Sequence, residues 1–122
     1  MGQKYLIDTN VAIDYLNNRL PETTRQIVNT HTINLSVISR MELLVWAKAT
    51  NDQQSVIRNF INAGSIFPLD EPVILKGIEI RKKHKIPLPD AIIAATAVVH
   101  RFTLITRNLS DFKNIEKLKV FN

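Results

Sequence analysis

Short apolar runs alternate with longer segments of helical periodicity along this chain of 122 residues, and this order constrains the fold more than any other feature. Strands are expected at residues 4–7, 32–36, 65–69 and 102–106, with an edge strand at 119–121. Helices are expected at residues 11–18, 21–29, 37–49, 51–63, 71–84 and 90–101. Strands separated by helices favour a parallel sheet that is covered on both faces. The sequence therefore predicts a single three-layer α/β/α domain over residues 1–122, with a central, mainly parallel sheet.

A few residues indicate where these elements begin and end. Ser36 directly follows an expected strand and is the predicted N-cap of the next helix. Pro21 is expected at the first position of its helix, and Gly64 is expected to end another. Pro87 and Pro89 are expected to break the chain before the last long helix begins.

The composition excludes several classes of site. The chain has no Cys, so it can form no disulfide or zinc–thiolate site and has no thiol nucleophile, which fits a cytoplasmic protein. Residues 1–20 lack the apolar core of a signal peptide, and no apolar run approaches transmembrane length, so no membrane partner is expected. The net charge of +5 favours either a phosphate-bearing partner such as a nucleic acid or a solvated basic surface.

Carboxylates follow or closely follow several expected strands, and each also has a purely structural explanation. Asp8 comes directly after the first strand and can cap the next helix. Asp90 opens a nearly all-apolar helix, where an acidic residue interacts favourably with the helix dipole. Asp111 follows the fourth strand among ordinary turn residues. Taken singly, none of these three residues identifies a site.

Glu42 is harder to explain by structure alone. Its helical neighbours Ile38 and Val45 are apolar, so it is expected on a largely apolar face. A capping box formed with Ser39 would account for it, but only if the helix began at Ser39. With Ser36 as the N-cap, Glu42 lies past the first turn and has no capping role. A structural and a functional interpretation of Glu42 are equally open at this point.

Together, the four carboxylates are expected at one edge of the sheet, because the carboxyl ends of parallel strands meet there. Two unit charges about 4 Å apart repel by about 4 kcal/mol at an effective dielectric near 20. Four converging carboxylates would therefore cost more than helix capping returns, unless a cation lies among them. Oxygen ligands in a chain without Cys favour a hard ion, Mg²⁺ or Mn²⁺. Such an ion polarises a phosphodiester and lowers the pKa of an attacking water, so this pattern in a basic chain is typical of a nuclease.

Four segments carry a family resemblance that spans nearly the whole chain. They are "LIDTNVAIDYL", "SVISRMELL", "LPDAIIAATAV" and "LITRNLSDF". In this order and spacing the chain resembles a PIN-domain ribonuclease, most closely the VapC toxins of toxin–antitoxin pairs. The resemblance implies a PIN-like fold in which the acidic metal site is formed by Asp8, Glu42, Asp90 and Asp111. It also implies polar support for this site from Thr106 and Asn108.

The same resemblance implies an activity and partners. The expected reaction is metal-dependent endonucleolytic cleavage of RNA by activated water, without a covalent enzyme intermediate. The expected partners are the RNA substrate, a second copy of the chain in a homodimer, and a cognate antitoxin protein. A PIN nuclease that processes RNA without being a toxin, or a PIN fold that binds RNA without cleaving it, would carry similar segments.

Two unrelated protein classes fit the sequence less well. A phosphatase of the haloacid-dehalogenase type also begins with an apolar strand and Asp-x-Asp, but the second acidic position here is Asn10, which cannot serve as an acid–base carboxyl. A receiver-type signalling domain needs an acidic pair after its first strand and a phosphoacceptor Asp after its third. The third strand here is followed only by Asp70, beyond Pro68, and the pair is absent.

Basic residues near the carboxylates have two open interpretations. The cluster at residues 80–85, "IRKKHK", precedes the segment that contains Asp90, and it either contacts an RNA backbone or forms a solvated helix end. Arg40 and Arg107 lie close in sequence to two of the acidic residues. They are candidates for binding phosphate or for offsetting local charge.

Overall fold

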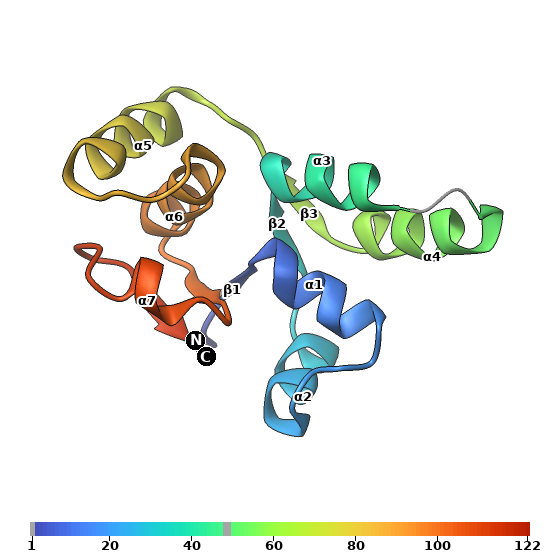
Figure 1. The fold of residues 1–122 in the computed structure, drawn as a ribbon. Helices are drawn as coiled ribbons and strands as arrows, with labels where there is room; N and C mark the ends of the chain where they lie inside the picture. Colours follow the sequence, from blue (N-terminus) through green and yellow to red (C-terminus); the bar gives the residue numbers. More distant parts are fainter. Residues whose placement is uncertain (1, 48–49) are drawn as a thin grey trace.

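A computed structural model describes residues 2–47 and 50–122 (Figure 1). The strands are β1 (Tyr5–Ile7), β2 (Asn34–Ser36), β3 (Ser65–Phe67), β4 (Thr103–Ile105) and β5 (Lys119–Phe121). The helices are α1 (Thr9–Leu16), α2 (Glu22–Thr30), α3 (Val37–Trp46), α4 (Asn51–Asn62), α5 (Glu71–Lys83), α6 (Leu88–His100) and α7 (Leu109–Phe112). Within the described ranges, no helix has the length and apolar character that crossing a membrane requires.

The strands form a central parallel sheet, as the sequence predicts. One ladder has the order β1-β4-β5 and a second pairs β2 with β3, and every pairing is parallel. The side chain of Asn34 joins the two ladders, because its Nδ2 donates to the carbonyl oxygen of Tyr5 at 2.8 Å. β2 therefore lies beside β1, and the carboxyl ends of β1, β2 and β4 are brought to one edge.

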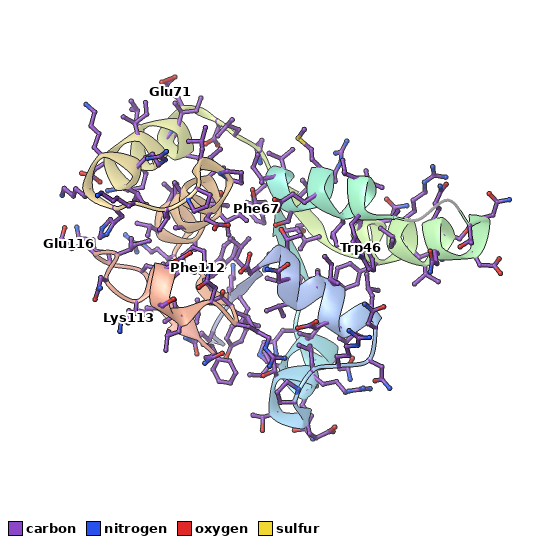
Figure 2. The ribbon with its side chains drawn as sticks, viewed as in Figure 1. Trp46, Phe67, Glu71, Phe112, Lys113 and Glu116 are labelled. Atoms are coloured by element: carbon purple, nitrogen blue, oxygen red, sulfur yellow. The ribbon has the colours of Figure 1, made fainter. Side chains whose placement is uncertain are left out.

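Alternating residues of the central strands face opposite helical layers. Leu6 and Leu104 pack with α5, α6 and α7, whereas Ile7 and Ile105 pack with the helices α1 to α4. These two groups of helices flank the sheet in Figure 1. Figure 2 labels Phe112, which belongs to the first core, and Trp46, which packs against the second. The predicted three-layer α/β/α arrangement is confirmed.

Side-chain N-caps and one glycine explain several helix boundaries. The predicted N-cap role of Ser36 is confirmed, since its Oγ accepts from the backbone N–H of Ile38 at 3.1 Å. α3 ends at Trp46, and the last two positions of the helix expected at 37–49 lie outside the described residues. α4 ends at Asn62, just before Gly64. A Cβ at Gly64 would lie 2.5 Å from the carbonyl oxygen of Ile33. The close approach of the backbone at Gly64 to Ile33 therefore requires glycine.

The structure corrects several of the predicted helices. α1 begins at Thr9 rather than 11, because Asp8 caps it. Pro21 is the N-cap of α2 and not its first helical residue. α6 begins at Leu88, so Pro89 lies inside its first turn, where the missing proline N–H has no helical acceptor to lose. The helix α7 was expected only as a turn.

Candidate active site

Asp8 lies at the carboxyl end of β1 and is buried, with 5% of its surface exposed. Its Oδ1 accepts from the backbone N–H of Thr9 at 2.8 Å, so it is indeed the N-cap of α1. Its Oδ2 accepts from the hydroxyl of Thr106, at the end of β4, also at 2.8 Å. Burial raises the pKa of Asp8, the two hydrogen bonds oppose this rise, and the charge of Glu42 adds to it. An N-cap needs neither burial nor the hydrogen bond from Thr106, so capping alone does not explain why Asp8 is buried and bonded in this way.

A chain of hydrogen bonds leads from Asp8 to Asp111. The fully buried Thr106 donates to Asp8 and accepts from the backbone N–H of Asn108 at 3.0 Å. Asn108 Nδ2 in turn donates to Asp111 Oδ2 at 2.8 Å. Both residues expected as polar support are thus bonded to acidic residues of the predicted site. Asp111 lies on the short helix α7, which holds it half-buried beside the end of β4.

Glu42 lies in the second turn of α3 and is exposed, which differs from the expected apolar surroundings. The buried residues of α3 are Ser39 and Leu43, four positions apart on one face, and this leaves Val45 85% exposed. Glu42 is nevertheless held in place, because the hydroxyl of Thr9 lies 2.6 Å from its Oε1. A bond between side chains 33 positions apart, and not a buried apolar face, fixes Glu42.

Asp90 is the common neighbour of the other three carboxylates. It lies in the first turn of α6 and is half-buried. Burial raises its pKa to about 6, and the negative charges of Asp8, Glu42 and Asp111 contribute to the rise. Hydrogen bonds link Asp8 to Glu42 through Thr9, and to Asp111 through Thr106 and Asn108. The structure thus brings together four carboxylates from β1, α3, α6 and α7.

The donor set of this acidic group suits a hard divalent cation. Every side chain in it offers oxygen, and a cation would relieve the repulsion that raises the pKa of Asp90. Asp8 has lone pairs left after its two hydrogen bonds. Over residues 2–47 and 50–122, however, no three His, Asp or Glu side chains already stand at the spacing of a metal-ligand shell. The four carboxylates are thus neighbours, but their spacing is wider than that of a metal-ligand shell.

The two arginines proposed from the sequence make contacts outside this group. Arg107 is exposed and forms an ion pair with Asp14, with 3.4 Å between Nη1 and Oδ2. Arg40 lines a hollow between α3, α4 and β3 that also contains Arg58. In the described part of the chain, neither arginine is hydrogen-bonded to one of the four carboxylates. Their role in substrate binding remains a prediction.

Sequence reasoning missed two residues of the site, Thr9 and Ser39. Thr9 Oγ1 lies 2.8 Å from Ser39 Oγ as well as 2.6 Å from Glu42 Oε1. The sequence presents Ser39 only as an alternative helix cap. The adjacency of Thr9 to Asp8 and the spacing of Ser39 from Glu42 are visible in the sequence. The packing of α1 against α3, which brings Thr9 to Ser39 and Glu42, cannot be seen in the sequence.

Comparisons with known proteins identify the family. The family model for the PIN domain matches residues 5–118. Ribonuclease VapC1 of Methanocaldococcus jannaschii is 28% identical over 127 residues, which cover 98% of this chain and 88% of that protein. A toxin–antitoxin complex from Klebsiella pneumoniae contains a chain that is 32% identical, with a TM-score of 0.82 and coverage of 98% of this chain and 97% of that one.

A further structure, DNA-bound VapBC from Salmonella typhimurium, has 25% identity, a TM-score of 0.85 and coverage of 98% of both chains. The fold, the order of the acidic segments and these likenesses agree with the resemblance found in the sequence. The chain belongs to the PIN-domain family.

Proposed function

We propose that this chain is a VapC-type toxin, a metal-dependent endoribonuclease that hydrolyses phosphodiester bonds of RNA with an activated water. The observation that carries the proposal is the hydrogen-bonded linkage of Asp8 to Glu42 and to Asp111. Burial and the charges of these three carboxylates raise the pKa of Asp90. Family membership and the likeness to Ribonuclease VapC1 support the same conclusion. The reaction takes place in the cytoplasm, where the RNA substrate is found.

Each acidic residue has a role in this proposal. Asp8, Glu42, Asp90 and Asp111 hold Mg²⁺ or Mn²⁺. When bound, such an ion lowers the pKa of a water molecule and stabilises the charge that develops on the phosphate. Asp8 is oriented by Thr9 and Thr106, and Asp111 is oriented by Asn108. Burial and the charges of its neighbours raise the pKa of Asp90, so a bound cation would favour its ionised form.

The proposed protein partners are a cognate antitoxin and a second copy of the chain. The similar chains from Klebsiella pneumoniae and Salmonella typhimurium were solved in toxin–antitoxin complexes. In the present chain, Met41 and Val45 of α3 and Leu75 of α5 are 59%, 85% and 59% exposed. Apolar side chains this open to solvent are typical of protein–protein surfaces.

RNA cleavage by the purified protein tests the proposal. The wild type is incubated with total RNA in Mn²⁺ or Mg²⁺ and then with a chelator, beside Asp90→Asn. We expect discrete fragments that disappear with the chelator, and a loss of rate of about 100-fold or more in the variant, since several kcal/mol of transition-state stabilisation depend on the ion. Asp52→Asn is the matched control, because this exposed carboxylate of α4 lies outside the acidic group.

Two results would contradict the proposal. One is full cleavage by a folded Asp90→Asn variant, and the other is wild-type cleavage that persists in the chelator. Binding of RNA and metal without any cleavage would identify the chain as an RNA-binding PIN fold instead.

A further inference from the structure

We propose that Thr9 is a positioning residue that holds the Glu42 carboxylate beside Asp8. The inference deepens the proposed function and rests on it. Thr9 reaches two acidic residues at once, since its backbone N–H donates to Asp8 Oδ1 at 2.8 Å and its hydroxyl lies 2.6 Å from Glu42 Oε1. One residue at the start of α1 thereby fixes the distance between a carboxylate of β1 and a carboxylate of α3.

The surroundings of the Thr9 hydroxyl leave it little freedom. Thr9 is 7% exposed and Ser39 is fully buried, and their side-chain oxygens lie 2.8 Å apart. The Thr9 hydroxyl donates to Glu42, because a carboxylate can only accept. Thr9 Oγ1 therefore lies between the buried Ser39 on one side and the acidic group on the other. A buried hydroxyl bonded to a carboxylate forms a short, charge-assisted contact.

Glu42 needs such a contact more than the other acidic residues do. It is exposed, and the side chain of a free Glu rotates about several bonds. The charge of Glu42 raises the pKa of both Asp8 and Asp90, so the same two residues repel it. The Thr9 hydroxyl opposes this repulsion, and no other hydrogen bond to the Glu42 carboxylate occurs in the described part of the chain.

The two bonds made by Thr9 can be separated experimentally. Its bond to Asp8 uses the backbone N–H, and its bond to Glu42 uses the hydroxyl. Thr9→Val removes the hydroxyl and keeps the shape of the side chain and the backbone donor. Asp8 then keeps its bonds from residue 9 and from Thr106, so the variant removes only the contacts of the Thr9 hydroxyl with Glu42 and Ser39.

The experiment measures binding of Mn²⁺ alone to metal-free protein by titration calorimetry, together with RNA cleavage. We expect Thr9→Val to weaken Mn²⁺ binding about 10- to 100-fold, which is the usual effect of losing a residue that orients a ligand. Thr9→Ser keeps the hydroxyl and should stay near the wild type. Thr96→Val is the matched control, because Thr96 is equally buried but its hydroxyl donates to the carbonyl of Ile92 within α6.

A double-mutant cycle identifies the residue through which Thr9 acts. In a Glu42→Gln background, Thr9→Val should cause little further loss of Mn²⁺ affinity. Additive losses would overturn the proposal, as would wild-type affinity in Thr9→Val or equal losses in Thr9→Ser and Thr9→Val.

The same measurements separate this proposal from the proposed function. A wild type that binds Mn²⁺ but cleaves no RNA would refute the nuclease function, and the affinities of the variants would still decide the role of Thr9. A wild type that binds no Mn²⁺ would overturn both.

Discussion

Asp90 is held differently from the other acidic residues of the site. Asp8, Glu42 and Asp111 each accept a hydrogen bond from a neighbouring side chain. The pKa of Asp90 reflects only burial and the three surrounding charges, with no lowering contribution from a donor. Ionised Asp90 is therefore a source of instability in the protein without metal, and a cation would remove it.

This difference predicts a pH-dependent stability for metal-free protein. Folding raises the pKa of Asp90 from 3.8 to about 6, so the folded state holds an extra proton between these values. The free energy of unfolding consequently falls as the pH rises through this window. We expect metal-free Asp90→Asn to be more stable than the wild type by about 1–2 kcal/mol above pH 6, after discounting a half-buried group for solvent screening.

Denaturant titration in the presence of a chelator, from pH 4 to pH 7.5, checks this prediction. The difference between variant and wild type should shrink as the pH falls toward 4, because folded Asp90 is then protonated and unfolded Asp90 begins to be protonated as well. Asp52→Asn should show no such trend. A constant difference at every pH would mean that the substitution acts through packing and not through the charge of Asp90.

Gly64, between α4 and β3, and Gly77, inside α5, differ in the space around them. A Cβ at Gly64 would meet the backbone oxygen of Ile33 at 2.5 Å, whereas one at Gly77 would lie 3.9 Å from the Cβ of Ala95. We expect Gly64→Ala to destabilise the fold by about 1–3 kcal/mol through overpacking. Gly77→Ala should stabilise it by about 0.5–1 kcal/mol, because Gly77 lies inside α5.

Thermal unfolding of the two variants measures both effects in one experiment. A gain in stability for Gly64→Ala would show that α4 and β2 can move apart at little cost. A loss for Gly77→Ala would show that α5 and α6 are packed more tightly than an ordinary van der Waals contact.

Local patterns in the sequence predicted the strands, the long helices and the N-cap at Ser36, because these depend on neighbouring residues. Local patterns predicted the wrong start for the helix that contains Pro89, because proline occurs both in the first turn of a helix and at a break in the chain. The contact between Thr9 and Glu42 was also beyond local patterns, since it depends on how α1 packs against α3. The four acidic positions were found from their place after strands and from the family resemblance, but their mutual distances required the fold.

At the scale of the whole molecule, the acidic residues lie where the two cores meet. Asp8 follows β1 in the sheet, Glu42 comes from the α1–α4 side, and Asp90 and Asp111 come from the α5–α7 side. Apart from these four carboxylates, the chain carries 16 Lys and Arg against 7 Asp and Glu, since 11 − 4 = 7. The rest of the protein is thus strongly basic around one acidic site.

Part of this basic surface lies between the end of α5 and the loop after α7, where Figure 2 labels Lys113 and Glu116. Lys83 and Lys117 line a hollow of about 350 Å³ there. The pKa of Glu79, beside them, is lowered by a hydrogen bond from Lys76 and its charge, and also by the charges of Lys83 and Lys117. Under the proposed function, these Lys side chains are candidates for contacts with the RNA backbone.

We predict that Lys83→Gln weakens the binding of single-stranded RNA several-fold and reduces the slope of log K against log salt by about 0.7, the contribution of one phosphate contact. Its affinity for Mn²⁺ should not change. Lys4→Gln, which removes an exposed charge at the amino end of β1, is the control. Equal effects of the two substitutions would indicate a general charge effect and no defined path for the RNA.

The pairing of β1 with β4 also has a consequence for biosynthesis. Asp8 and Thr106 are bonded across 98 positions of the chain, and β4 lies between β1 and β5 in its ladder. Such distant partners meet late and slowly during folding. A ribosome that has made the first hundred residues has produced three of the four carboxylates but not the strand that aligns them. Under the proposed function, the acidic site of the growing chain is therefore incomplete until residues 103–111 have been synthesised.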